Sequence, residues 1–186
     1  MLKALLLQLI SVVVYVAFLV IGIKRKVPFK KQIVFFLFYF YIVGVVSVTM
    51  FPLPIHSIDI EFLKTTRYLK NNFVPLKSIG GMIKDGNTHT VIRQIIGNII
   101  LFIPMGALLP MNFKSLFSFK RVALVGFLAS VAIELLQFLI SFIIGATYKI
   151  TDVDDILLNF VGCIVGYLLF RLSIPILKKS VTKTTF

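Results

Sequence analysis

The chain has 186 residues, of which 59% are hydrophobic and 13% aromatic, and its mean hydropathy is +1.01. These values exclude a soluble domain, so we expect a single polytopic membrane domain over residues 1–186. The net charge of +13 would suit a nucleic-acid binder, but the Lys and Arg residues cluster at the ends of apolar runs. Membrane topology and anionic lipids account for such clusters, and we expect no nucleic-acid partner.

Five apolar stretches have the length of a membrane span, since a helix needs about 20 residues to cross the hydrocarbon core. The expected fold is an all-α integral membrane bundle of about five transmembrane helices with one long outer connector. The third stretch is short and contains Pro104 and Gly106, which predicts a kinked or partly buried helix. In the second stretch, the Phe-rich run 35–41 is predicted to face lipid. The predicted spans are 5–23, 33–51, 95–109, 122–144 and 156–177.

Basic residues between the spans predict the orientation, because cytoplasmic loops carry an excess of Lys and Arg. Such residues are frequent in 24–31, between the first two spans, and in 114–121, between the third and fourth. We therefore expect both loops and the C-terminus inside the cell, and the N-terminus outside. Residues 52–94 and 145–155 are then the outer connections.

The long outer connector contains weaker signals. Ile58, Phe62, Leu63 and Leu69 lie near one face of a predicted interfacial helix over 58–69. Pro75 predicts a bend that presents Lys77, and the pair Gly80 and Gly81 predicts a further turn. A solvated connector is the alternative interpretation, although connectors of this length usually have a role.

Polar side chains inside a span indicate function, because they are costly in hydrocarbon. Glu134 and Gln137 lie three residues apart in the fourth span and share a helical face. Two interpretations of Glu134 stay open: a chemical role, or an ion pair with Arg93 or Lys149.

A stripe of five residues at spacings of three and four follows one helical face at the start of the fifth span. It leads from Asp152, Asp155 and Asn159 to Gly162 and Gly166. The acidic part is interpreted as a helix N-terminal cap, a functional cluster, or both. The two glycines predict a helix-packing face, either within the chain or in a homodimer.

Cofactor chemistry has little support in the sequence. No cofactor is expected; the alternative is a divalent cation held by oxygen atoms of Asp152, Asp155 and Asn159. The sequence contains no Gly-rich phosphate loop, serine elbow or zinc motif, so catalysis would depend on Glu134 and Asp155 as acid and base. Cys163, the only cysteine, is expected to be a packed, inert thiol.

Four segments, in this order along the chain, resemble the signatures of VanZ-like membrane proteins. They are NFVPLKSI at 72–79, NIILFIPMGALLP at 98–110, ELLQ at 134–137 and DVDDILLNFVG at 152–162. The resemblance predicts a VanZ-like core over residues 72–170. The family usually has an arginine where this chain has Lys149, which puts bidentate recognition of a carboxylate or phosphate at that position in doubt.

The resemblance implies a bacterial cytoplasmic-membrane protein of the cell envelope, in the group named for teicoplanin resistance, and thus a role in antibiotic resistance. We expect a binder that lowers susceptibility to teicoplanin-type lipoglycopeptides by engaging the drug or a lipid-linked wall precursor at the outer leaflet. Membrane lipids are further expected partners. The alternatives are a membrane-embedded enzyme acting on a lipid head group, and a transporter with Glu134 as proton relay. The polar cluster expected near the outer leaflet consists of Lys77, Arg93, Asn98, Glu134, Gln137, Lys149, Asp152, Asp155 and Asn159.

Overall fold

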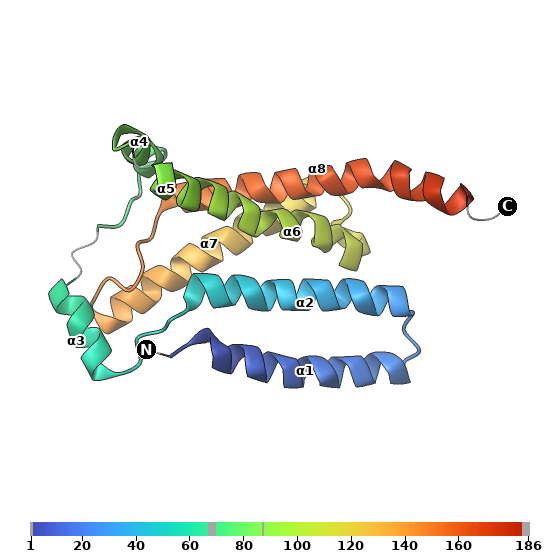
Figure 1. The fold of residues 1–186 in the computed structure, drawn as a ribbon, viewed down its shortest axis with the longest axis horizontal. Helices are drawn as coiled ribbons and strands as arrows, with labels where there is room; N and C mark the ends of the chain where they lie inside the picture. The colour runs from blue at the N-terminus through green and yellow to red at the C-terminus, as the bar shows by residue number, and fades with distance from the viewer. Residues whose placement is uncertain (1, 67–69, 87, 184–186) are drawn as a thin grey trace.

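Helices dominate the computed structural model, which describes residues 2–66, 70–86 and 88–183 (Figure 1). The α-helices are α1 (Ala4–Lys24), α2 (Phe29–Met50), α3 (Ser57–Thr66), α4 (Lys77–Lys84), α5 (Thr88–Val91), α6 (Gly97–Asn112), α7 (Phe119–Ile144) and α8 (Val153–Lys183). A π-helix, η1 (Ile92–Ile96), joins α5 to α6, and a 3-10 turn, η2 (Lys114–Leu116), precedes α7.

Five described helical stretches are long and apolar enough to cross a membrane. Their presence confirms the predicted class, an all-α membrane bundle. The third stretch is longer than expected, because α5, η1 and α6 run together from Thr88 to Asn112 and Pro104 stays inside α6. The fifth begins earlier than expected: Asp152 Oδ1 accepts the backbone N–H of Asp154 at 2.9 Å and caps the first turn of α8. The five stretches are Ala4–Lys24, Phe29–Met50, Thr88–Asn112, Phe119–Ile144 and Val153–Pro175.

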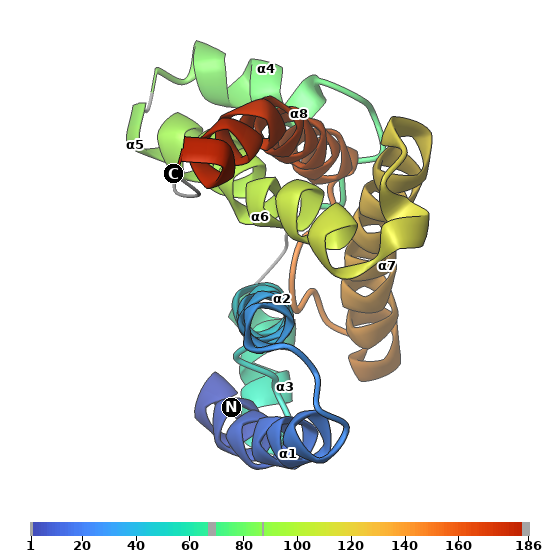
Figure 2. The same ribbon diagram turned by 90° about the vertical axis from the view of Figure 1, so that its right-hand side faces the viewer.

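The bundle has a tightly packed part and a looser one. Helices α6, α7 and α8 lie together, α2 lies against α6, and α1 lies on the side of α2 away from α6 (Figure 2). The α1–α2 and α6–α7 connections lie at one end of the bundle, and α3, α4 and α5 at the other (Figure 1). The two basic loops therefore share one end, which we call the basic end.

Glycines bring α6 and α8 into backbone contact. A Cβ at Gly162 would overlap the carbonyl of Ile99, and a Cβ at Gly166 would overlap the carbonyl of Ile103. From the opposite side, a Cβ at Gly106 would overlap backbone atoms of α8. Small residues permit this close approach, and dispersion contacts then hold the helices together without a hydrophobic driving force. Both stripe glycines thus pack within one chain, while the predicted homodimer stays a prediction.

We expected the Phe-rich run of α2 to face lipid, but part of it packs against α1. Tyr15 of α1 packs at 5.2 Å from both the Phe36 and Phe40 rings, measured between ring centroids. Tyr39 OH donates a hydrogen bond to the carbonyl of Ser11 at 2.9 Å. These aromatic side chains attach α1 to α2, since neighbouring rings favour edge and tilted contacts.

The connector contains more helix than expected. The predicted interfacial helix corresponds to α3, and Leu69 lies outside the described residues. Gly80 and Gly81 do not form a turn; they lie inside α4. The expected turn is wrong because α8 stabilises α4 from outside, through a carboxylate described below, and so offsets the low helix propensity of glycine.

A polar cavity as candidate binding site

Asp155, in the first turn of α8, is held by two amide side chains of the third span. Gln94 Nε2 lies 3.0 Å and 3.2 Å from its two carboxylate oxygens, and Asn98 Nδ2 lies 2.6 Å from Oδ1. Gln94 belongs to the π-helix η1, an irregularity that is frequent at functional sites. The two amides supply the hydrogen bonds that a half-buried carboxylate needs away from bulk water.

Ser130 and Glu134, polar residues one turn apart on α7, face α8. Glu134 Oε2 accepts the backbone N–H of Asp152 at 2.9 Å, and Ser130 Oγ accepts Asn159 Nδ2 at 3.0 Å. Ser130 and Glu134 are both buried. These two residues therefore connect two spans and do not face lipid.

Two aspartates attach the outer connector to the start of α8. Asp152 Oδ1 accepts a hydrogen bond from Asn72 Nδ2 at 2.8 Å. The backbones of Asn72 and Asp152 also pair, in an isolated parallel β-bridge. Asp154 is 1% exposed and accepts the backbone N–H groups of Leu76, at 2.5 Å, and Ile79, at 3.1 Å. A carboxylate at these first N–H groups caps α4 from a distant part of the chain.

A cavity of about 470 Å³ lies between α2, η1–α6, α7 and the start of α8; we call it the polar cavity. Gln137 Nε2, on its wall, donates to the carbonyl of Thr49 at 2.9 Å. Among the described residues of the predicted cluster, Lys77 and Asp152 do not line it. The predicted residues that do line it are Arg93, Asn98, Glu134, Gln137, Lys149, Asp155 and Asn159.

Asn159 lines this cavity and has an unused hydrogen-bond acceptor. The residue is 2% exposed, and within the described part of the chain its Oδ1 has no hydrogen-bond partner. A buried acceptor left unsatisfied costs about 1–3 kcal/mol. A ligand that donates a hydrogen bond to Oδ1 would recover part of that free energy.

Lys149 adds positive charge at the cavity. Its Nζ donates to the carbonyl of Val48 at 3.1 Å. Burial lowers the pKa of the ammonium below its ordinary value, and the carboxylate of Glu134 opposes this shift. Glu134 accepts the Asp152 backbone N–H and also interacts electrostatically with Lys149, so both interpretations of Glu134 stay open. Tyr148, next to Lys149, donates a hydrogen bond to the carbonyl of Met50 and so attaches the α7–α8 connection to α2. Burial raises the pKa of Tyr148 to about 12.

A second hollow, which we call the apolar groove, has a volume of about 340 Å³. Phe73 and Phe138 are among its apolar walls. Glu134 lines both this groove and the polar cavity, so one carboxylate lies between an apolar surface and a polar one.

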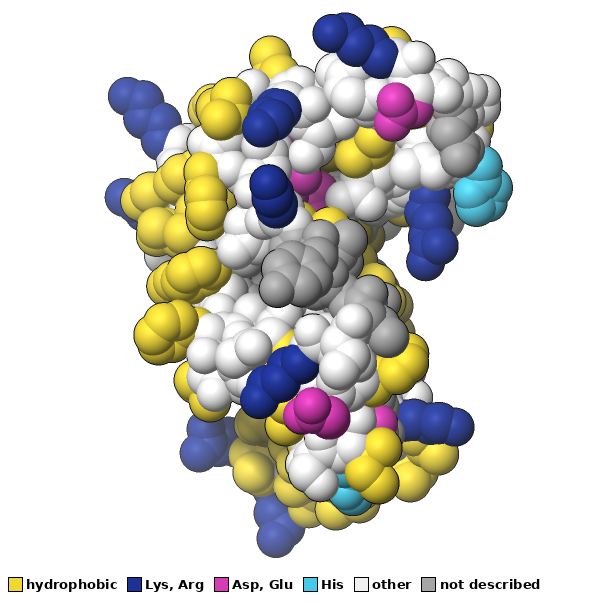
Figure 3. Space-filling model, turned by 90° about the vertical axis from the view of Figure 1, so that its left-hand side faces the viewer, with side chains coloured by type: hydrophobic (Ala, Val, Ile, Leu, Met, Phe, Trp, Pro, Cys, Tyr) yellow, Lys and Arg dark blue, Asp and Glu magenta, His cyan; other side chains and the backbone are white. Residues whose placement is uncertain are grey.

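Figure 3 views the end of the molecule that carries α3–α5. Lys and Arg side chains are spread over this end, and acidic side chains show at only a few points.

Two of the three side chains proposed for a cation, Asp152 and Asp155, already have hydrogen-bond partners, and only Asn159 Oδ1 lacks one among the described residues. Asp152 Oδ1 accepts two hydrogen bonds and Asp155 accepts from two amides. Within the described ranges, no group of three or more His, Cys, Asp or Glu side chains could hold a metal ion. This arrangement fits hydrogen bonding better than metal coordination, and a bound cation stays a prediction.

Sequence reasoning did not select three of the residues that build this region. Gln94 lies four residues before Asn98 and shares its helical face, so the sequence places the two amides together although the predicted cluster did not include Gln94. Asp154 and Asn72 act through contacts with residues far away in the chain, for which periodicity carries no signal.

The fold and this region define a polytopic helical membrane protein with a polar cavity among its spans. The profile of the VanZ/LLP1 family matches residues 38–175, which extends beyond the predicted core of 72–170 on both sides. The chain is also 32% identical over 128 residues to Protein VanZ of Enterococcus faecium, covering 68% of this chain and 69% of that protein. No solved structure matches. The chain belongs to the VanZ/LLP1 family, and the resemblance inferred from the four segments is confirmed.

Proposed function

We propose that the polar cavity binds the sugar-bearing head of an amphiphile at the outer leaflet, and that this binding lowers susceptibility to teicoplanin-type lipoglycopeptides. The ligand is either the drug itself or a lipid-linked wall precursor, since each joins a polar head to an apolar chain. The observation that carries the proposal is a cavity that fits a small ligand and whose lining residues include Asn159, which has a buried, unpartnered Oδ1.

The chemistry of the cavity wall supports a head group with both donors and acceptors. Asn159 and the carboxylates of Glu134 and Asp155 accept hydrogen bonds from hydroxyl or amide groups. Arg93 and Lys149 supply positive charge for an anionic group on the same head.

The apolar groove supports a ligand with a hydrocarbon chain. Its Phe73 and Phe138 walls suit an acyl or prenyl chain, and Glu134 lies between the groove and the polar cavity. A ligand of this kind would remain partly in the membrane while its head is bound.

The charge distribution supports the orientation. The basic loops 24–31 and 114–121 share one end of the bundle (Figure 1). In a bacterial cytoplasmic membrane this end would lie inside, with the C-terminus, and α3–α5 outside with the N-terminus.

Removing the cavity carboxylates tests the proposal. We expect Asp155→Asn and Glu134→Gln to weaken ligand binding about tenfold or more, since hydrogen bonds to charged groups contribute about 1.5–3 kcal/mol. The measurement is teicoplanin susceptibility of cells producing each variant at the parent's membrane abundance. Asp85→Asn, which neutralises an exposed carboxylate of the same connector, is the control and should keep full protection. Full protection by both cavity variants would contradict the proposal.

An enzymatic role uses the same two carboxylates, because Glu134 and Asp155 line one cavity. Incubation of the purified protein with extracted lipid-linked precursors separates the two functions. The binder leaves the precursor unchanged, whereas turnover that is lost in Asp155→Asn would identify an enzyme.

A further inference from the structure

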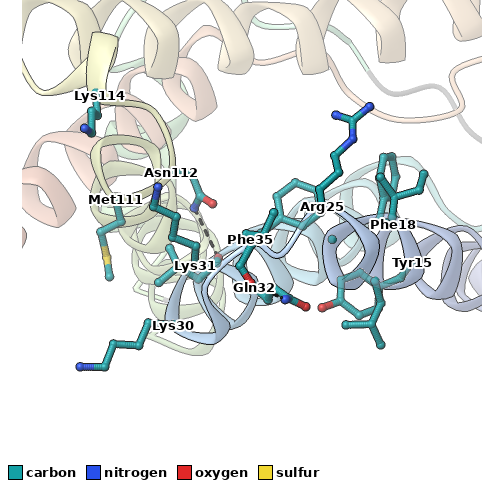
Figure 4. Close-up of a pocket in the computed structure, with 15 residues that line it drawn as sticks. Tyr15, Phe18, Arg25, Lys30, Lys31, Gln32, Phe35, Met111, Asn112 and Lys114 are labelled. Carbon is teal, nitrogen blue, oxygen red and sulfur yellow. Dashed lines mark hydrogen bonds between the residues drawn. The ribbon is translucent and has the colours of Figure 1, made fainter.

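We propose that a third hollow, a cavity at the basic end of the bundle, binds an anionic phospholipid of the leaflet that adjoins it. This cavity lies between α1, α2 and the end of α6 and has a volume of about 620 Å³ (Figure 4). It is formed by residues other than those of the polar cavity, so the two proposals are independent.

The cavity results from the loose packing of α1. Helix α1 lies against α2 and on the side away from α6 (Figure 2), so that α2 forms the floor between two walls. Phe18 and Leu19 on the α1 wall are 46% and 37% exposed. On the other wall, Asn112 Nδ2 donates to the α2 carbonyl of Val34 at 3.4 Å and holds the end of α6 in place. An apolar hollow with such walls accommodates part of an acyl chain.

The charge around the cavity defines the ligand. Four of its lining residues are cations, Arg25, Lys30, Lys31 and Lys114, and they come from three different segments. In Figure 4, Arg25, Lys31 and Lys114 extend to one side of α2, and Lys30 extends away from them. Basic pockets between transmembrane helices on the cytoplasmic side are typical sites for phosphate head groups.

The combination of apolar walls and cations selects the occupant. A zwitterionic lipid would match the walls but not the charge, and an acidic protein segment would match the charge but not the exposed apolar surface. An anionic phospholipid satisfies both, with its phosphate near Arg25 and Lys31 and its chain along Phe18 and Leu19.

The test is native mass spectrometry of the full chain with phosphatidylglycerol and with phosphatidylcholine. We expect the parent to retain phosphatidylglycerol preferentially, and Arg25→Gln/Lys31→Gln to weaken its binding about tenfold or more, because two cations facing the phosphate are lost. The control Lys24→Gln/Lys26→Gln removes the same charge from the same loop at residues that do not line the cavity, and should change binding little.

A variant that keeps every cation provides an independent measurement. Leu19→Trp fills part of the cavity at the basic end, so we expect it to weaken phosphatidylglycerol binding as well. The proposal is overturned if both lipids bind equally, if the Lys24 and Lys26 control loses as much affinity as the Arg25 and Lys31 variant, or if Leu19→Trp binds like the parent.

Discussion

Alanine at Gly162 or Gly166 should destabilise the bundle strongly. Each new Cβ would overlap a carbonyl of α6, and the obstacle is backbone, which cannot rotate away as a side chain can. Overpacking of this kind typically costs about 1–3 kcal/mol, and here α6 and α8 must move apart along their most extensive contact. We expect a lower midpoint of thermal unfolding in detergent and reduced abundance in the membrane.

Gly97→Ala is the matched control. Gly97 also lies in α6, but a Cβ there meets nothing within 4 Å. This variant should be as stable as the parent or slightly more stable, since alanine favours helix. Equal stability of Gly97→Ala and Gly166→Ala would show that the glycine face does not control packing.

Replacement of Asp154 by alanine should release α4 from α8. The substitution leaves the N–H groups of Leu76 and Ile79 without their acceptor, and a hydrogen bond to a charged group typically contributes about 1.5–3 kcal/mol. We expect faster hydrogen exchange of α4 amides and easier proteolysis of the connector, while exchange of the α6 and α8 amides stays close to that of the parent. Asp85→Ala, at the exposed C-terminal end of α4, should change neither. Unchanged exchange at Leu76 and Ile79 in the Asp154 variant would contradict this assignment.

The sequence was sufficient for the features that depend on local pattern. Length and hydropathy predicted five membrane spans, and a spacing of three and four predicted that Asp155 and Asn159 share a helical face. The structure places both on the polar cavity, and it places Gly162 and Gly166, further along α8, against α6. A single helical stripe thus combines a polar surface with a packing surface.

Features that depend on distant contacts were not predictable in this way. Helix α4 contains Gly80 and Gly81, and its local propensity is low; the acceptor that stabilises it, Asp154, lies in another part of the chain. The π-helix at Gln94 and the attachment of α1 through the aromatic residues of α2 likewise depend on partners that periodicity cannot identify.

The central claim is that the polar cavity binds an amphiphile, and direct binding tests it most closely. The measurement is the affinity of the purified full chain, in lipid nanodiscs, for a lipid-linked wall precursor and separately for teicoplanin. We predict saturable binding of at least one of the two ligands, weakened about tenfold or more in Asp155→Asn and unchanged in Asp85→Asn. Absence of binding of both ligands, or equal affinities of the parent and Asp155→Asn, would contradict it.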